Sequence, residues 1–276
     1  MSRDRTLETN RREALKFAGA LAAAAWIGGG RAQAADLPLH TTGLEHLGLT
    51  VPDVDKTGKF YGRIFDPALY KEKNPPLRYY VRLGTGYIAV GGKAGATPKI
   101  DHVCALVQDY QPQQMRQSLE EAGVKVGAVG MIPDPDGFRL QLLGTPGGLA
   151  KSTVPAGRIS EEEPVVQPVG LDHIMLIVAD LEPTAAFYRR FFGMEALRTK
   201  NPERAWFDAA GTRLGLEQAS GGRQPGVDHF CVKVANLDRG TTPDKLRKLG
   251  VEMAPSNDEG LLRFRDPDGI LVELKG

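Results

Sequence analysis

The chain is poor in the residues that would support several common classes of protein. It holds two cysteines and five histidines in 276 residues, aromatic residues make up 7%, and 35 Lys/Arg nearly balance 34 Asp/Glu. A net charge this close to zero gives no indication of the basic surface that a nucleic-acid-binding protein needs. The two cysteines occupy equivalent positions of a repeat described below, so pairing them would require unrelated surfaces to meet. We expect Cys104 and Cys231 to be buried, unpaired residues.

The chain also lacks an apolar run that would span a bilayer comfortably. Its main candidate, from Phe17 to Gly30, follows Arg11-Arg12 and precedes Ala32-Gln33-Ala34. This order resembles a twin-arginine export signal, with cleavage expected after Ala34. The resemblance implies a transient partnership with the twin-arginine translocase and a periplasmic mature protein without a stable membrane span. Residues 1–34 hold six Lys/Arg and three Asp/Glu, so the remainder carries 29 basic and 31 acidic residues, formally −2.

Four of the five histidines stand in one repeated phrase: an apolar residue, an acid and then histidine. The four copies are Leu44-Glu45-His46, Ile100-Asp101-His102, Leu171-Asp172-His173 and Val227-Asp228-His229. The interval between the two histidines is identical in the two halves of the chain. Such regular self-similarity indicates one module copied four times.

The repeat extends beyond the histidines. Phe60-Tyr61 recurs at Phe187-Tyr188, with the same offset that relates the histidines of the two halves. The Asp-Pro-Asp-Gly sequence at 134–137 recurs at 266–269, with an offset that a short insertion makes slightly larger. We interpret the two Asp-Pro-Asp-Gly segments as hairpin turns, because Pro presets φ and Gly permits positive φ. They are informative about the fold and carry no chemistry in this interpretation.

Each module is predicted to be βαβββ. Its histidine opens an apolar, β-branched strand, a helix follows, and further strand-like runs complete the unit. In the third module Asp180 or Pro183 can begin the helix, and Gly193 ends it. The fold class is therefore α+β, with the modules paired into two domains at 41–145 and 168–276. Residues 146–167 lack periodicity and are rich in Pro, Gly and acids, which predicts a linker.

The second domain offers a set of metal ligands. His173 and His229 are each followed, at one and the same interval, by a glutamate, Glu217 and Glu273, so four donors stand at equivalent positions. Two histidines with two phased carboxylates are a coordination set for a divalent metal, with Zn, Ni, Co, Mn and Fe(II) as candidates. One ion is expected.

The first domain does not repeat this set. The same count from His46 leads to Val90, and the residue that matches Glu273 across the turn is Gln141. The candidate donors of domain one, which are His46, His102 and Gln141, include no carboxylate. They would therefore compensate poorly for the dehydration of a divalent ion. We therefore interpret domain one as a degenerate copy whose histidines are structural.

These modules resemble the vicinal oxygen chelate superfamily, which includes glyoxalases, extradiol dioxygenases and bleomycin-resistance proteins. The resemblance covers residues 41–276 and implies a curved sheet around a metal whose open positions chelate adjacent substrate oxygens. Glyoxalase-like members use four protein ligands, which would be His173, Glu217, His229 and Glu273 here. Either Glu217 or Glu273 would then be the catalytic base that moves a proton, while the metal stabilises charge on the substrate oxygens.

Extradiol dioxygenases suggest a different assignment of the same residues. Their iron would be held by His173, His229 and Glu273 alone. Two departures oppose this hypothesis: residues 174–228 hold no catalytic histidine, and the position of the family's tyrosine is taken by Arg263.

The favoured hypothesis is an exported, metal-dependent lyase or isomerase that acts on a small molecule, with the dioxygenase as the alternative. A small-molecule binding protein of the bleomycin-resistance type is the third possibility. Five further residues lie on strands that are expected to border the domain-two cavity, where an arginine could bind a carboxylate or phosphate. They are Trp206, Asp208, Arg213, Arg263 and Arg265.

Overall fold

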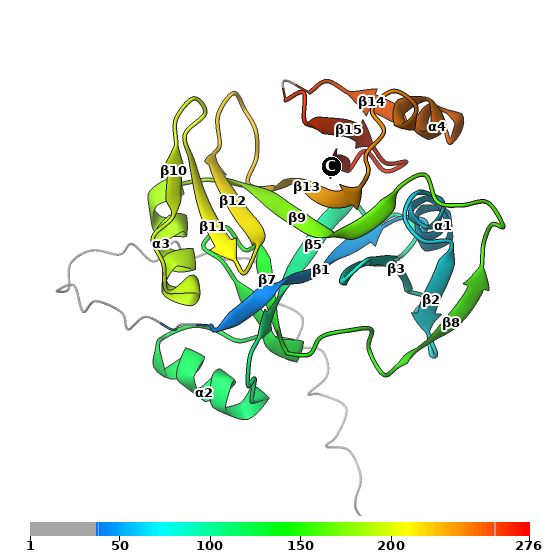
Figure 1. Ribbon diagram of the computed structural model, residues 1–276. Helices are drawn as coiled ribbons and strands as arrows, with labels where there is room; N and C mark the ends of the chain where they lie inside the picture. Colours follow the sequence, from blue (N-terminus) through cyan, green and yellow to red (C-terminus); the bar gives the residue numbers. More distant parts are fainter. Residues whose placement is uncertain (1–36, 38, 257) are drawn as a thin grey trace, which may run out of the picture. The chain divides into compact units, whose positions relative to one another are not determined.

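The structure is a computed structural model that describes residues 37–276, apart from 38 and 257 (Figure 1). The predicted export signal at 1–34 lies outside the described residues. Within the described part, every helix is too short or too polar to cross a membrane. Two eight-stranded sheets form the framework, one from each predicted domain.

The first sheet has the strand order β6-β7-β5-β1-β4-β3-β2-β8. Its first module contains β1 (Thr41–Val51), α1 (Val54–Ile64), β2 (Ala68–Glu72), β3 (Tyr79–Leu83) and β4 (Gly86–Gly92). Its second contains β5 (Lys99–Val107), α2 (Pro112–Glu121), the 3₁₀ turn η1 (Ala128–Gly130), β6 (Met131–Pro133) and β7 (Arg139–Gly144).

The second sheet has the order β10-β11-β12-β9-β13-β16-β15-β14. The third module contains β9 (Gln167–Val178), α3 (Leu181–Phe192), β10 (Leu197–Thr199), β11 (Arg204–Ala209) and β12 (Thr212–Gln218). The fourth contains β13 (Gly226–Ala235), α4 (Thr242–Lys248), β14 (Glu252–Ala254), β15 (Leu261–Arg265) and β16 (Leu271–Lys275). The α+β fold with paired modules is thus confirmed.

One module departs from the βαβββ pattern. The second module has three strands among its described residues, because the stretch between α2 and β6 forms η1 instead of a strand. The eighth place in that sheet is taken at the other edge by β8 (Thr153–Arg158), which pairs antiparallel with β2. Residues 146–167, predicted as a linker, do connect the two sheets, but part of the segment is sheet.

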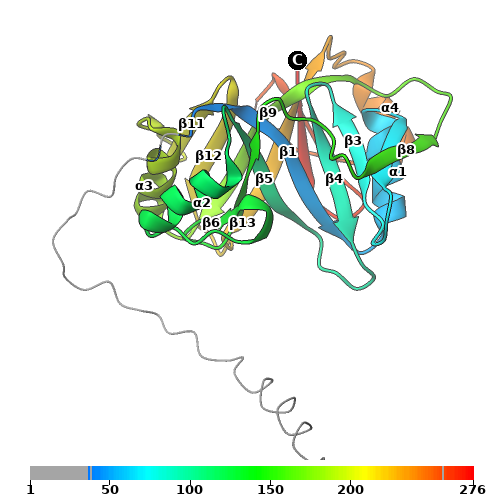
Figure 2. The same cartoon turned by 90° about the horizontal axis from the view of Figure 1, so that it is seen from below.

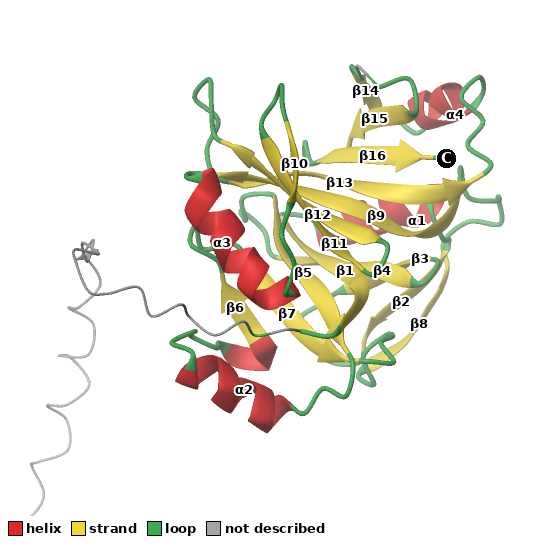
Figure 3. Cartoon of the chain, turned by 60° about the vertical axis from the view of Figure 1, so that its left-hand side comes forward, coloured by secondary structure: helices red, strands yellow, loops and turns green. Residues whose placement is uncertain are grey.

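Local signals in the sequence produce the helices where they were expected. Asp180 caps α3 by accepting a hydrogen bond from the backbone N–H of Glu182, and Gly193 ends the helix with φ 63°. Only glycine adopts that left-handed conformation without steric cost. The buried face of α3 carries Tyr188 and Phe191, and the helix lies along β11 and β12 (Figure 3).

The two domains exchange hydrogen bonds reciprocally. Tyr61 on α1 donates to Asp266 of the second domain at 2.7 Å, and Tyr188 on α3 donates to Asp134 of the first at 3.1 Å. All four side chains are buried. The two tyrosines are equivalent positions of the repeat, and so are the two aspartates, so the contact obeys the same internal symmetry as the histidines. Figure 2 shows α1 and α3 at opposite ends of the pair of sheets.

The aspartates in this exchange belong to the Asp-Pro-Asp-Gly turns. In each turn one carboxylate oxygen accepts two backbone N–H groups, those of Asp136 and Phe138 for Asp134. The other oxygen accepts the tyrosine of the opposite domain. The hairpin turns predicted from sequence are therefore present, and they also connect the domains. A single hydrophobic cluster continues from one sheet to the other.

Candidate metal centre

Three donor atoms converge inside the second sheet. His173 on β9 and His229 on β13 face each other with their Nε2 atoms 3.1 Å apart, and Glu273 on β16 places Oε2 3.4 Å from each. Neighbouring strands bring them together, since β13 lies between β9 and β16. All three side chains are buried, at 4–6% exposure.

The acid of each repeated phrase orients its histidine. Asp172 lies 2.8 Å from Nδ1 of His173, and Asp228 lies 2.6 Å from Nδ1 of His229. Each contact makes Nδ1 the protonated nitrogen, so that Nε2 presents its lone pair to the cavity. Burial alone would raise the pKa of Asp228, but the contacts with His229 and Arg223 outweigh burial and lower that pKa to about 2. This aspartate therefore stays ionised.

The three donor atoms fit a divalent metal. Ligand atoms about 2.0–2.1 Å from one ion lie roughly 3.0–3.4 Å from one another, which is the spacing found here. Three donor lone pairs that face one another in a buried space repel unless a proton or a cation lies between them. The pKa values respond as expected for such a cluster. Burial lowers the pKa of His173, yet Asp172 and Glu273 raise it more, and the net shift is upward.

Glu217, the fourth predicted ligand, is not part of this group. It is buried on β12 and lines the same cavity, but two guanidinium groups hold its carboxylate. Arg204 donates from Nε to Oε2 at 2.7 Å, and Arg223 donates from Nη1 to Oε1 at 2.5 Å. Of the predicted four-ligand set, the structure brings His173, His229 and Glu273 within metal-binding distance of one another.

The cavity around this group has a volume of about 600 Å³. Of the five residues on strands expected to border it, Trp206, Arg213, Arg263 and Arg265 line it. Asp208 lies on one of these strands, β11, but its side chain is exposed and accepts a hydrogen bond from the N–H of Gly211 in the hairpin turn. Arg263 lies on β15 with Nε 2.9 Å from Oε1 of Glu273, where it balances the charge of that carboxylate.

Sequence reasoning missed three cationic residues of this cavity: Arg204, Arg223 and Lys275. Strand alternation identifies the first, because Arg204 stands two residues before Trp206 on β11 and so shares its face. Lys275 stands two residues after Glu273 and follows the same rule. Arg223 lies in the loop between β12 and β13, for which the sequence offers no comparable signal.

Among its described residues the first domain lacks a counterpart of the group of two histidines and a glutamate; the donors that lie close together there are Glu45, His46 and Cys104. His46 Nδ1 lies 3.0 Å from Glu45, and its Nε2 lies 3.0 Å from Oε1 of Gln141. Burial is the main cause of the lowered pKa of His46. Tyr87 stacks on the imidazole at 4.4 Å between ring centroids. This histidine is thus hydrogen-bonded through both nitrogens within a filled interior, as a structural role requires.

The strand register also corrects one detail of the repeat. Counting from His46 assigned Val90 to the position of Glu217, but Glu217 pairs with Ile177 and its counterpart is the residue paired with Thr50. That residue is Gly91. In β4, the repeat of domain one is therefore shifted by one residue relative to β12 of domain two. Gly91, like Val90, provides no carboxylate at this position.

The cysteines are free and buried, as expected. Cys104 lies near Glu45 and His46, and Cys231 near Asp172 and His173. Burial raises the pKa of both thiols well above the usual range. A thiol that stays protonated is a poor metal ligand, so these groups do not compete with the three donors above.

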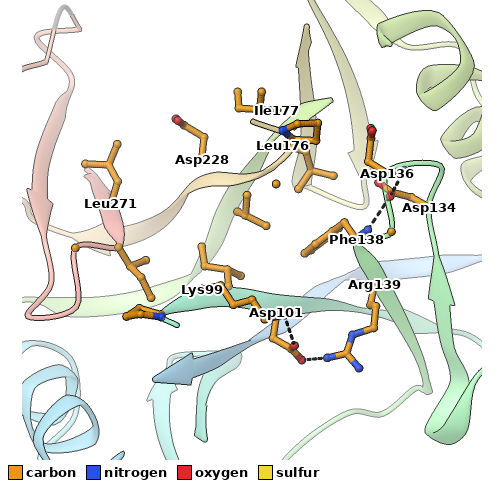
Figure 4. Close-up of a pocket in the computed structure, with 18 of the residues that line it drawn as sticks. Lys99, Asp101, Asp134, Asp136, Phe138, Arg139, Leu176, Ile177, Asp228 and Leu271 are labelled. Carbon is orange, nitrogen blue, oxygen red and sulfur yellow. Dashed lines mark hydrogen bonds and ion pairs between the residues drawn. The ribbon is translucent and has the colours of Figure 1, made fainter. Parts of the chain in front are cut away.

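A second cavity, of about 440 Å³, lies between the two sheets (Figure 4). Lys99, Asp101 and Arg139 contribute from domain one, and Asp101 accepts a hydrogen bond from Arg139 and contacts Nδ1 of His102. Asp228 lines this cavity as well as the metal cavity. The residue that orients His229 is therefore part of the lining of both cavities.

Comparison with known proteins shows a family match within the second domain. Residues 170–274 match the family model described as the Glyoxalase/Bleomycin resistance protein/Dioxygenase superfamily. The chain is 29% identical over 183 residues to a probable chloroplastic lactoylglutathione lyase of Arabidopsis thaliana, which covers 57% of this chain and 46% of that protein. It is 26% identical over 184 residues to the mitochondrial methylmalonyl-CoA epimerase of Mus musculus, covering 58% and 99%. The chain thus spans about half the length of the plant relative.

Solved structures share the fold over most of the chain. A catechol 2,3-dioxygenase superposes with a TM-score of 0.61 at 19% identity, covering 85% of this chain and 87% of that one. The Mn(II)-bound glyoxalase from Novosphingobium aromaticivorans gives 0.62 at 16% identity, covering 85% and 82%. The family match lies in the second domain, and the common fold extends over both sheets, with four modules in two domains.

Proposed function

We propose that the chain is a metal-dependent enzyme that binds a small molecule through two adjacent oxygens. His173, His229 and Glu273 hold one divalent ion in domain two. The observation that carries this proposal is the convergence of their three donor atoms at 3.1–3.4 Å in a buried cavity. The ion, when bound, supplies Lewis-acid polarisation of the chelated oxygens. Asp172 and Asp228 keep both imidazoles in the tautomer that binds it.

Among the possible reactions we favour extradiol cleavage of a catechol, in which the ring carbon–carbon bond beside the two hydroxyls breaks and both atoms of dioxygen enter the product. Two histidines with one carboxylate are typical of non-haem iron(II) oxygenases, because three protein ligands leave positions for a chelating substrate and a further small molecule. A four-ligand site would need Glu217, whose carboxylate is already engaged by Arg204 and Arg223.

The lyase or isomerase favoured from sequence is the second candidate. It is supported by the relatives, a lactoylglutathione lyase and a methylmalonyl-CoA epimerase, and by the position of Glu273 beside both histidines. In this reaction Glu273 is the carboxylate within reach of a substrate proton. Glu217 is less available for that role than expected from sequence, because guanidinium groups bind both of its carboxylate oxygens.

One set of assays separates these candidates. The protein is purified without metal under argon and loaded singly with Fe(II), Mn(II), Co(II), Ni(II) or Zn(II). Oxygen uptake with a panel of catechols, in the Fe(II) or Mn(II) form, supports the dioxygenase. Metal-dependent conversion of a hemithioacetal, or exchange of a proton next to a substrate carbonyl with solvent, without oxygen uptake, supports the lyase or isomerase. Failure to bind any of the five metals would overturn both and leave the small-molecule binding protein.

We also propose that residues 1–34 direct export to the periplasm through the twin-arginine translocase, with cleavage after Ala34. The Arg11-Arg12 pair and the apolar run that follows it support this proposal. Its test is given in the Discussion.

A further inference from the structure

One wall of the metal cavity is a flat aromatic surface. Trp206 on β11 lies across Gly215 of β12, where an added Cβ would stand 2.6 Å from the indole ring. Its ring is 5.4 Å from that of His173, edge to face, and Arg213 lies over it at 5.0 Å. Glycine at 215 is therefore required for the indole to lie flat. The wall therefore offers an aromatic contact beside a proposed metal ligand, with the Arg213 guanidinium next to it.

Arg204, next to the indole on the same face of β11, has hydrogen-bond donors that are not used within the described part of the chain. Arg204 shares the face of Trp206, two residues away on β11, and faces Glu217 across the strand pair. Its Nε is bound to Glu217, while its two terminal amino groups have no partner among the described residues. Two parallel N–H groups are the donors that a planar guanidinium uses for a carboxylate or a phosphate.

Glu217 holds the guanidinium of Arg204 in position, and the positive charge of the cavity still exceeds the negative charge. It is buried, with 7% of its surface exposed, and it binds Arg223 as well as Arg204. Arg223 also donates a hydrogen bond to Asp228 at 2.8 Å, and Asp228 contacts Nδ1 of His229. A continuous chain of charged contacts thus runs from the arginine to the proposed metal ligand, so the two ends of the cavity are held in a defined relation.

The charge of the cavity favours an anion. Its lining includes six cationic side chains and four carboxylates. The six are Arg204, Arg213, Arg223, Arg263, Arg265 and Lys275. A bound divalent ion would increase this positive excess. In a partly enclosed space such a field attracts anionic ligands and repels cationic ones.

We propose that the substrate is an anion, with a carboxylate or phosphate group bound by Arg204 and its body packed beside Trp206 and Arg213. This inference rests on the proposed function for the other end of the substrate, where two adjacent oxygens meet the metal. Glu217 is a positioning residue that holds Arg204 and Arg223. Trp206 and Arg204 determine specificity.

The main experiment compares two ligands that differ in the anion. The Zn(II)-loaded protein, which does not turn over a catechol, is titrated with 3-(3,4-dihydroxyphenyl)propanoate and with the neutral 4-ethylcatechol. We expect the carboxylate to bind about tenfold or more tightly, since a charged hydrogen-bonded pair contributes about 1.5–3 kcal/mol. Arg204→Gln should remove that preference. Arg204→Lys, which keeps the charge but not the planar fork, should retain part of it.

Arg78→Gln is the matched control. Arg78 lies over Gly91 in domain one, as Arg204 lies over Glu217 in domain two, and should have no effect on the preference. Metal-free protein tests the anion site independently of the metal, with 3-phenylpropanoate and 2-phenylethyl phosphate as probes. Tighter binding of one identifies the anion as carboxylate or phosphate. Equal affinity for the two catechols in the wild type, with no effect of Arg204→Gln on either metal-free probe, would overturn the proposal while leaving the metal site intact.

Discussion

At the scale of single residues, two aspartates prepare the histidines of the candidate metal centre. Asp172 and Asp228 each contact Nδ1 and so direct Nε2 toward Glu273. Replacing either aspartate by asparagine weakens the tautomer preference and the basicity of the imidazole. We expect Asp228→Asn to lower metal affinity about 10- to 100-fold, as the loss of a carboxylate partner does for metal-bound histidines.

Equilibrium dialysis against Zn(II) measures this affinity. The matched control is Asp101→Asn, because Asp101 contacts His102 of domain one in the same way. The control should bind metal like the wild type. Equal loss in both variants would mean that the effect comes from general destabilisation.

The four histidines of the repeated phrase should differ by domain in their effect on metal binding. His173→Ala or His229→Ala removes one of three ligands, and we expect loss of the bound metal. His46→Ala and His102→Ala should retain it, since His46 is occupied by Glu45 and Gln141. Metal analysis of the four purified variants measures the outcome. Loss of metal in His46→Ala would assign a site to domain one.

At the scale of elements, the turn that carries Asp134 makes stability depend on pH. Burial raises the pKa of Asp134 from 3.8 to about 6, which outweighs its hydrogen bonds to Tyr188 and the turn. The folded state therefore favours the protonated acid. Its stabilising effect is complete below the unfolded pKa and is lost as the pH rises through the folded value. Between pH 7.5 and 5 the free energy of unfolding should increase by about 1–1.5 kcal/mol from this group.

Urea unfolding of metal-free protein at several pH values tests this expectation. Asp134→Asn cannot ionise, and its slope between pH 7.5 and 5 should be smaller. The upward pKa shift of His173 contributes in the same direction and stays in both proteins, so the difference between them reports Asp134. Identical slopes would show that the turn is not titrating in this range.

Some of these elements could be predicted from the sequence and others could not. The α3 helix ends at Gly193, as expected, because cap and C′ glycine are local signals. The grouping of His173, His229 and Glu273 followed from the repeat, since equivalent strands meet at the centre of a sheet. The capture of Glu217 was not predictable, because Arg223 reaches it from a loop without a pattern. The presence of β8 at the edge of the first sheet was also not predictable, because it depends on how that sheet is assembled and not on a local pattern in the sequence.

At the scale of the whole molecule, the sequence predicts export of the folded, metal-loaded chain. Replacing Arg11 and Arg12 by lysine should leave the precursor in the cytoplasm, because the translocase reads the arginine pair. Cell fractionation and the N-terminal sequence of the mature protein measure this. Normal export of the double-lysine variant would exclude the twin-arginine route, and a mature N-terminus other than residue 35 would relocate the cleavage site.

The two domains have the same fold but different chemistry. Domain one keeps the reciprocal tyrosine contacts with domain two, while its repeat positions hold Gln141 and Gly91 where domain two has Glu273 and Glu217. Domain one thus supports the architecture, and the proposed chemistry concentrates in domain two. The reciprocal exchange also explains why the pair forms one compact unit.

The most direct test is the metal content of the wild type, Glu273→Gln and Glu217→Gln, each purified from its own host and measured by mass spectrometry. We expect about one equivalent per chain in the wild type, as one three-donor site requires. Glu273→Gln should lose it. Glu217→Gln should keep it, because that carboxylate holds Arg204 and Arg223 and lies outside the three-donor group. Two equivalents in the wild type, or loss of metal in Glu217→Gln, would contradict a single His173, His229 and Glu273 centre.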